Sequence, residues 1–197
     1  VLVMSDEIHS DLIFHGKKHI PTATLSPEIA ANVVTGISGT KTFNLAGLQI
    51  SNIFIPNEKL RKAFQTEIDK TGYDEPNALG IVACEAAYRA GEDWLDQLRA
   101  YLLKNLNFLR NFLQEKIPQI HLVEPEGTYL VWLDCSELGI TGEELDQFIV
   151  DKAGLWLDGG SMFGPSGAAF QRVNIACPQA TLELALNKLK AAVDNLE

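Results

Sequence analysis

The chain has 197 residues, of which 46% are hydrophobic and 21% are charged, as is ordinary for a globular protein with a sizeable core. Its formal net charge of -10 would repel a phosphate backbone, and no basic stripe with interleaved aromatic residues offsets that repulsion, so we expect no nucleic-acid ligand. No apolar run approaches the ~18 residues that a membrane helix needs and no secretory leader is recognisable, so we predict a cytoplasmic protein without a membrane partner.

The first part of the chain alternates predicted strands and helices, the pattern of an α/β protein. It opens directly on an apolar strand, Val1 to Ser5, from which we expect that the chain is a fragment of a longer protein. The other elements predicted here are a short helix opened by Ser26-Pro27-Glu28, strands over Asn32 to Ile37 and Ser51 to Ile55, and helices over Asn57 to Lys70 and Asn77 to Ala90. The segment Thr71 to Pro76 breaks the pattern between the last two helices.

The second part begins with leucines at helical spacing, which predict a long amphipathic helix over Glu92 to Lys116. We place a domain boundary at its start, giving a first domain over residues 1–91 and a small α+β domain over residues 92–197. The elements predicted beyond this helix are strands over His121 to Val123, Thr128 to Leu133, Leu155 to Leu157 and Gln171 to Ile175, a helix opened by the capping box Thr141-Gly142-Glu143-Glu144, and a closing helix over Ala180 to Leu196.

Several features are interpreted as structural. Cys84, Cys135 and Cys177 are widely spaced in apolar or small-residue surroundings, which indicates reduced thiols in the core. His15 and His19 lack the carboxylates or cysteines that would complete a metal site, so we expect a solvated loop and no metal. The run Gly159 to Gly167 resembles a phosphate cradle in composition only, because no helix with a lysine follows it, and we interpret it as a mobile loop near the substrate entrance.

Lys41 is the strongest candidate for chemistry. It follows the apolar stretch that ends at Ile37 and lies in the run Ser38-Gly39-Thr40-Lys41-Thr42. A lysine that forms a Schiff base with a phosphorylated cofactor needs a rigid strand end behind it and hydroxyl or amide donors beside it. Asp6 also follows a predicted strand, at an edge where open α/β sheets bind ligands, although an aspartate there is more often a turn former or a helix cap.

Three runs together resemble the fold-type I pyridoxal-phosphate enzymes: Asp6-Glu7-Ile8-His9, the run from Ser38 to Gly47, and Arg172-Val173-Asn174-Ile175-Ala176-Cys177-Pro178. Within that superfamily, Ser-Asp-Glu-Ile-His and Lys-Thr-Phe-Asn-Leu-Ala-Gly are most similar to the cystathionine β-lyase branch of the class I/II aminotransferase relatives. The resemblance covers the chain but only the second half of such an enzyme. It implies the last part of a large α/β domain with a mainly parallel sheet, followed by a small α+β domain.

The resemblance also implies a role for each matched residue. Lys41 would bind pyridoxal 5'-phosphate covalently and then act as the general base on the substrate Cα. Asp6 would keep the pyridine nitrogen protonated. His9 would donate a hydrogen bond to the phenolic oxygen, or else be satisfied by nearby backbone. Ser38 and Thr40 would donate hydroxyls to the phosphate, or else simply end a strand.

Arg172 completes the set implied by the resemblance. Its planar guanidinium would form a bidentate clamp on the α-carboxylate of an amino-acid substrate, with a surface ion pair as the alternative. One position departs from the aminotransferase pattern: eight residues after the lysine the chain has Gln49, where aminotransferases commonly have an arginine on the cofactor phosphate. The loss of that charge favours the lyase branch.

The function implied is a carbon–sulfur β-lyase that cleaves L-cystathionine or related cysteine S-conjugates to a thiol, pyruvate and ammonia. Two alternatives stay open, a transaminase that uses the same lysine and a non-catalytic regulatory or interaction protein. The resemblance further implies a homodimer with shared active sites, in which the loop from Thr71 to Asn77 approaches the site of the partner.

Overall fold

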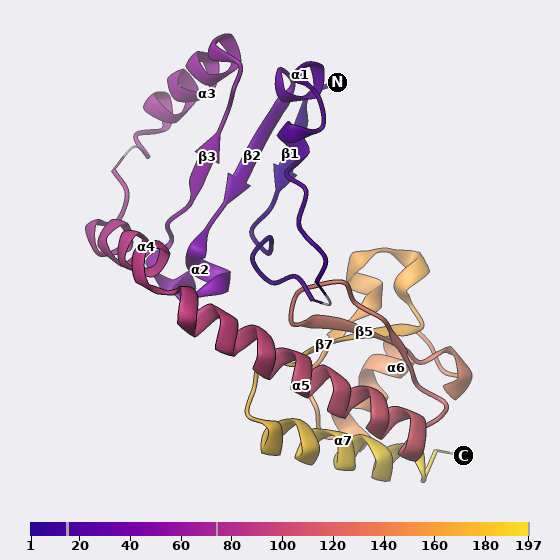
Figure 1. Cartoon of the computed structure of the whole chain (residues 1–197). Coiled ribbons are helices and arrows are strands. Elements are labelled where there is room, and N and C mark those ends of the chain that lie inside the picture. Colours follow the sequence, from indigo (N-terminus) through magenta and orange to yellow (C-terminus); the bar gives the residue numbers. More distant parts are fainter. Residues whose placement is uncertain (15, 74, 197) are drawn as a thin grey trace. The chain divides into compact units, whose positions relative to one another are not determined.

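The computed structural model describes residues 1–14, 16–73 and 75–196, and the chain divides into two compact units, Val1–Leu98 and Arg99–Glu197. Each unit has its own sheet and its own set of helices (Figure 1). The boundary between the units falls inside one long helix, a few residues beyond the predicted domain boundary at residues 91–92, which remains a prediction. The α/β and α+β classes expected from the sequence are confirmed, the first in the N-terminal unit and the second in the C-terminal unit.

The sheet of the first unit has three strands in the order β1-β2-β3 (Figure 1). They are β1 (Val3–Asp6), β2 (Val33–Ile37) and β3 (Asn52–Phe54). β1 pairs with β2 in parallel, with Asp6 opposite Gly36, whereas β3 pairs with β2 in antiparallel fashion. Because β1 and β2 are parallel, the residues that follow them emerge at the same edge of the sheet.

The helices of the first unit are α1 (Pro27–Ala30), α2 (Gly39–Thr42), α3 (Glu58–Thr71) and α4 (Ala78–Ala90). Their starting points follow from capping chemistry. Ser26, Asn57 and Asn77 each accept hydrogen bonds from backbone amides of the first turn that would otherwise have no partner. The predicted helices of this part are confirmed to within two residues.

The sheet of the second unit is antiparallel, with the strand order β4-β5-β7-β6. The strands are β4 (His121–Val123), β5 (Leu130–Asp134), β6 (Asp158–Gly159) and β7 (Phe170–Asn174). Residues at alternating positions of β5 and β7 are buried on one face of this sheet; Val131, Leu133 and Val173 are apolar, and Gln171 is polar. β7 lies between β5 and β6, so Arg172 has a neighbour on each side.

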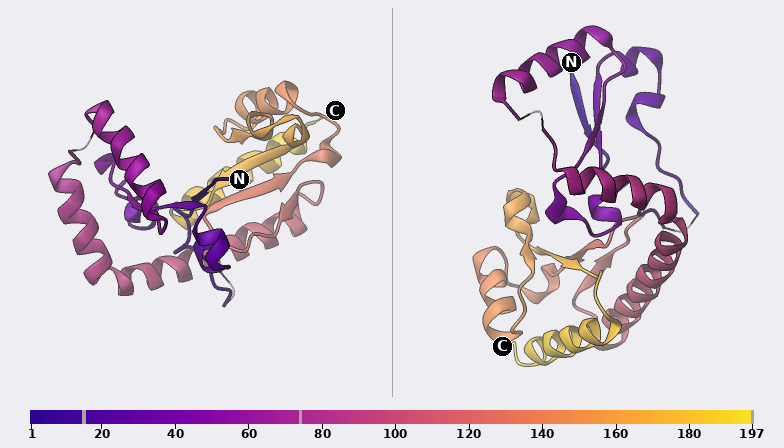
Figure 2. Two further views of the ribbon diagram at one scale, coloured as in Figure 1. Left: turned by 90° about the horizontal axis from the view of Figure 1, so that it is seen from above. Right: turned by 90° about the vertical axis from the view of Figure 1, so that its left-hand side faces the viewer.

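Helix α5 (Glu92–Lys116) has the limits that the leucine spacing predicts, and α7 (Gln179–Val193) lies beside it (Figures 1 and 2). The amide of Gln179 donates to the hydroxyl of Tyr101 at 2.8 Å, which joins the start of α7 to α5. Four leucines that α5 contributes to the core of the second unit are buried to 1% exposure or less: Leu102, Leu106, Leu109 and Leu113. A shorter helix, α6 (Glu143–Gln147), continues into a π-helical turn over Phe148–Lys152.

Two sequence predictions in this unit are wrong. The capping box predicted Thr141 as the cap of α6, but Gly142 takes that place with a φ of 60°, a conformation that favours glycine, and no side chain caps the helix. The strand predicted over Leu155 to Leu157 lies instead at Asp158–Gly159, because only these two residues pair with β7. Trp156 is 90% exposed, so the apolar run before β6 does not reflect burial in the sheet.

Within the described ranges, none of the helices is both long and apolar enough to cross a membrane.

Candidate active site

Lys41 lies at the edge where β1 and β2 end. β2 leads through Ser38 directly into α2, and Lys41 is the third residue of that helix. Its side chain is exposed, whereas Thr40 and Thr42 on either side are buried. The one turn of α2 therefore presents the lysine amine to solvent and turns both threonines toward the protein, and the role of Lys41 stays a prediction.

Ser38 and Thr40 are connected to each other and to the backbone. Ser38 Oγ accepts from the amide of Thr40 at 3.1 Å, which caps α2, and it lies 2.6 Å from the carbonyl oxygen of Ile50 and 2.9 Å from Thr40 Oγ1. The two residues are 4% and 7% exposed. These bonds support a structural role in shaping the turn before Lys41, and the phosphate contacts of both hydroxyls remain a prediction.

Asp6 is the last residue of β1, and His9 follows three residues later in the turn at the same edge of the sheet. Asp6 is exposed, and its Oδ1 accepts from the amide of Ile8 at 3.2 Å, the local bond by which an aspartate shapes a turn. His9 is half-buried in that turn, and its carbonyl accepts from the amide of Leu12. Asp6 is paired with Gly36 of β2, and Gly36 precedes Ser38 by two residues. Asp6 and the segment that carries Lys41 therefore lie at the ends of two adjacent strands.

A buried carboxylate next to Asp6 was not expected from the sequence. Glu7 is 6% exposed; its Oε1 accepts from the amide of Thr22 and from Ser5 Oγ, and its Oε2 lies 2.7 Å from His19 Nε2. Burial by itself raises the pKa of Glu7, but the hydrogen bonds from His19, Thr22 and Ser5 outweigh it and leave the pKa below its ordinary value. Glu7 thus ties the end of β1 to the loop through His19, a link that no short-range pattern indicates.

Arg172 is in β7 of the second unit, and the other five predicted site residues belong to the first. Its Nη2 and Nε donate to Asp158 Oδ2 at 2.7 Å and 3.1 Å, and the guanidinium carbon lies 4.5 Å from the centre of the Phe163 ring. The alternative weighed from the sequence, an ion pair, is therefore present in this structure. The substrate clamp stays a prediction, because a guanidinium has five N–H donors and Asp158 uses two of them.

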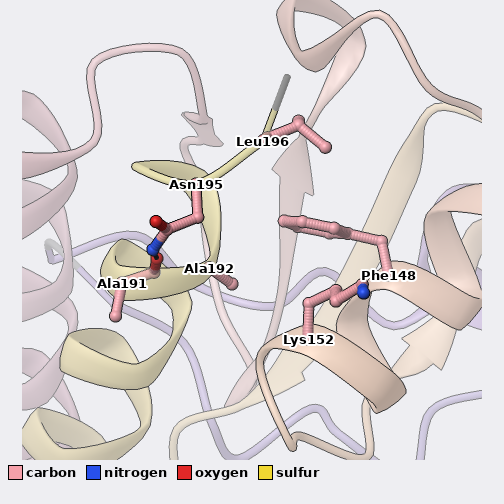
Figure 3. A pocket seen from close by; sticks show the side chains of 6 residues that line it. All are labelled: Phe148, Lys152, Ala191, Ala192, Asn195 and Leu196. Carbon is pink, nitrogen blue, oxygen red and sulfur yellow. Dashed lines mark hydrogen bonds between the residues drawn. The ribbon is translucent and has the colours of Figure 1, made fainter.

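The hollow drawn in Figure 3 contains none of these residues. It lies between the π-helical turn after α6 and the end of α7, and Phe148, Lys152, Ala191, Ala192, Asn195 and Leu196 line it. Lys152 is the one ionisable group of this lining, so the hollow offers no acid and base pair. We assign it no catalytic role.

No cluster of His, Cys, Asp or Glu among the described residues could hold a metal ion. Of the histidine pair considered from the sequence, His15 lies outside the described residues. His19 has Glu7 as its partner. The three cysteines are free thiols; Cys84 and Cys135 are buried as expected, whereas Cys177 is only half-buried. Burial raises the pKa of Cys135 to about 12, so its thiol stays protonated at neutral pH.

A comparison with known protein families identifies the family of the chain. The model of the class I and II aminotransferases matches residues 1–189. The chain belongs to this family. Cystathionine beta-lyase PatB of Bacillus subtilis (strain 168) is 42% identical over 193 residues, which make up 98% of this chain and 50% of PatB. The predicted membership of the class I/II aminotransferase superfamily, on its cystathionine β-lyase branch, is confirmed.

Two solved structures of the family have the same fold. A putative aminotransferase from Clostridium difficile 630, solved with bound pyridoxal phosphate, is 42% identical, has a TM-score of 0.95 and aligns with 98% of this chain and 50% of its own. Cystalysin from Treponema denticola, which contains a pyridoxal 5'-phosphate cofactor, is 34% identical with a TM-score of 0.97, over 100% of this chain and 50% of its own. The chain thus spans about half the length of these relatives.

Proposed function

We propose that the protein containing this chain is a pyridoxal-phosphate-dependent carbon–sulfur β-lyase that cleaves L-cystathionine or related cysteine S-conjugates. With one water consumed to hydrolyse the three-carbon fragment left after the thiol departs, the products would be a thiol, pyruvate and ammonia. The 42% identity with the cystathionine β-lyase PatB is the observation that carries the proposal. The exposed amine of Lys41, at the sheet edge where Asp6 also emerges, is the feature of the structure that supports it.

The residues of the first unit fit pyridoxal phosphate in their chemistry. An exposed lysine amine suits the cofactor aldehyde, an exposed carboxylate suits a pyridinium nitrogen, and both lie at the edge where two paired parallel strands end. When bound, the cofactor supplies an electron sink for the pair of electrons left at the substrate Cα. Asp6 would keep the ring nitrogen protonated, and His9 would donate to the phenolic oxygen.

The steps assigned to protein groups are few. The amine of Lys41 removes the Cα proton and holds it, and the thiolate then leaves from the β carbon. Arg172 orients the substrate through its α-carboxylate, for which a planar guanidinium is better shaped than an ammonium. Ser38 and Thr40 keep α2 in place behind the lysine. In this proposal both also donate to the phosphate, for which the single hydroxyl hydrogen of Ser38 would leave its present acceptor, the carbonyl of Ile50.

Gln49 supports a lyase over a transaminase. It stands eight residues after Lys41, is exposed, and has a left-handed backbone with a φ of 50°. An arginine there would add a positive charge for the phosphate, whereas glutamine adds none. We keep the transaminase as the second candidate because the chain belongs to the family of class I and II aminotransferases.

Assembly and location are part of the same proposal. We propose a homodimer with shared active sites, with the loop from Thr71 to Asn77 approaching the site of the partner; Asp74 in this loop lies outside the described residues. We also propose a cytoplasmic location, which the free thiols of Cys84, Cys135 and Cys177 support because a reducing compartment keeps cysteines in that form.

Pyruvate release tests the activity. The protein containing this chain is incubated with L-cystathionine in the absence of any added keto acid, and pyruvate and free thiol are measured. Equal amounts of both products are expected. A protein that binds the cofactor but forms no pyruvate, and exchanges amino groups once a keto acid is added, is a transaminase.

A second measurement separates an enzyme from a non-catalytic protein. The visible absorbance of lysine-bound pyridoxal phosphate is expected in the wild type and lost in Lys41→Ala. The matched control is Lys62→Ala, which removes an exposed helical lysine whose partner is Glu58. A wild type without cofactor absorbance, or a Lys41→Ala variant that keeps it, contradicts the assignment of Lys41.

A further inference from the structure

A hydrogen bond connects the segment that carries Lys41 with the segment that follows β1. Thr42 Oγ1 donates to Oδ2 of Asp11 at 2.8 Å, across 31 residues of sequence. Thr42 has no exposed surface, whereas the adjacent Lys41 is exposed. The bond therefore lies on the protein side of α2, opposite the side from which the lysine emerges.

Helix α2 cannot hold its direction without such anchors. It has four residues, a single turn, and an isolated turn of helix is unstable because its few hydrogen bonds do not offset the ordering of its backbone. Ser38 anchors the start of the turn by capping it and by reaching the carbonyl of Ile50. Thr42 anchors its end, through Asp11.

Asp11 belongs to a segment that is itself well held. Leu12 and Phe14, directly after it, are 0% and 3% exposed, and the amide of Leu12 donates to the carbonyl of His9. The same turn begins at Asp6 and Glu7, where the Glu7 carboxylate is bound to His19 and Thr22. The bond from Thr42 to Asp11 thus holds the helix that carries Lys41 against the segment that carries Asp6 and His9.

We propose that Thr42 and Asp11 are a positioning pair, which sets the direction of the Lys41 amine relative to Asp6. The inference rests on the proposed function, since it concerns how the lysine meets a cofactor aldehyde. Neither residue takes part in the chemistry. Loss of the bond leaves α2 free to tilt, and displacements of about 1 Å at a reacting group can cost about 100-fold in rate.

The test follows covalent capture of the cofactor, which needs no turnover. Apoprotein is mixed with pyridoxal phosphate, samples are reduced with borohydride over time, and the pyridoxyl adduct on Lys41 is quantified by mass spectrometry. We expect Thr42→Val, which keeps the shape of the side chain and removes the hydroxyl, to slow capture by about 10-fold to 100-fold. Thr42→Ser, which keeps the hydroxyl, restores most of the rate.

Two further variants complete the design. Thr35→Val is the matched control, because Thr35 is also a buried threonine of the first unit and its hydroxyl has no hydrogen-bond partner in the part of the chain described; it should capture at the wild-type rate. Asp11→Ala should be slow as well, and the double variant with Thr42→Val no slower than Thr42→Val alone, because both changes remove the same bond. If Thr42→Val folds too poorly to measure, Asp11→Ala provides the same comparison.

The outcomes are distinct. A wild-type capture rate in Thr42→Val and Asp11→Ala overturns the pair while leaving the proposed function intact. The pair is also overturned if Thr42→Val captures the cofactor slowly and Thr42→Ser does not restore the rate. The same holds if the control Thr35→Val captures the cofactor as slowly as Thr42→Val. A wild type that forms no adduct on Lys41 refutes the proposed function, and the positioning role falls with it.

Discussion

Asp158 lies directly opposite Arg172 in the β6–β7 ladder, and one of its carboxylate oxygens accepts two hydrogen bonds from the guanidinium. The ring of Phe163 lies against the guanidinium, with a separation of 4.5 Å. The arginine is therefore oriented by two neighbours before any substrate arrives. Such preorganisation suits a residue that has to bind a carboxylate in one direction, because less side-chain freedom is lost on binding.

Replacing Arg172 by lysine tests this arrangement. An ammonium keeps the charge but loses the planar fork and the contact with Phe163, so we expect KM for the amino-acid substrate to rise by about tenfold or more, with a smaller change in kcat. Steady-state kinetics on the holoenzyme measure both. Arg110→Lys is the control, since Arg110 is also paired with a carboxylate, Glu124, but is outside the candidate site. An unchanged KM would remove Arg172 from the proposed clamp.

Replacing Asp6 by asparagine should damage chemistry more than cofactor binding. The amide keeps the size and the local turn but cannot hold the pyridine nitrogen protonated, so we expect kcat to fall by about tenfold or more, equivalent to about 1.4 kcal/mol of barrier. Cofactor titration and kcat are measured side by side. Asp6→Glu, which keeps the charge, should retain more activity than Asp6→Asn; equal losses in the two variants would argue against a charge effect.

Replacing Glu7 by glutamine should change how stability depends on pH. The pKa of Glu7 is lower in the folded chain than in the unfolded chain, so the unfolded state binds the proton more readily. The stabilisation from this group is then fully present above its unfolded pKa and is lost as the pH falls through the lower, folded value. We expect Glu7→Gln to lose about 1–3 kcal/mol near neutral pH and to show less acid destabilisation than the wild type.

Urea unfolding at neutral and acidic pH measures this difference. Glu137→Gln is the control, because Glu137 also has a histidine partner, His121 at 2.9 Å, but both side chains are more than half exposed. An exposed pair of this kind contributes little, so its pH profile should match that of the wild type. Parallel profiles for Glu7→Gln and the wild type would contradict the buried network.

Replacing Asn105 by alanine should destabilise the second unit. Asn105 in α5 has no exposed surface, and its Nδ2 donates to the carbonyls of Ile175 and Cys177 at 2.9 Å, just beyond β7. Truncation leaves two carbonyls without this donor, for which we expect a loss of about 1–3 kcal/mol in urea unfolding. Asn187→Ala, whose exposed side chain donates to Glu183 within α7, should lose much less. Equal losses would show that burial of the bond is unimportant.

Local patterns in the sequence were sufficient to predict the positions of most of the helices. The leucine spacing predicted both ends of α5 because a buried face repeats with the helical period wherever the partner lies. Asn57, Asn77 and Ser26 marked helix starts because a cap acts on amides within three residues of itself. Signals failed where the chain took an unusual conformation, as at Gly142, or where an apolar residue such as Trp156 stayed exposed.

The sequence by itself determined the family, the alternation of elements and the set of residues proposed for the chemistry, because motifs such as Asp6 to His9 and Ser38 to Gly47 are contiguous. Only the tertiary structure decided how those residues are supported. The bonds from Thr42 to Asp11, from Glu7 to His19 and from Arg172 to Asp158 each join positions that are 12 or more residues apart. Such bonds depend on strand register and on the path of loops, which no short-range pattern records.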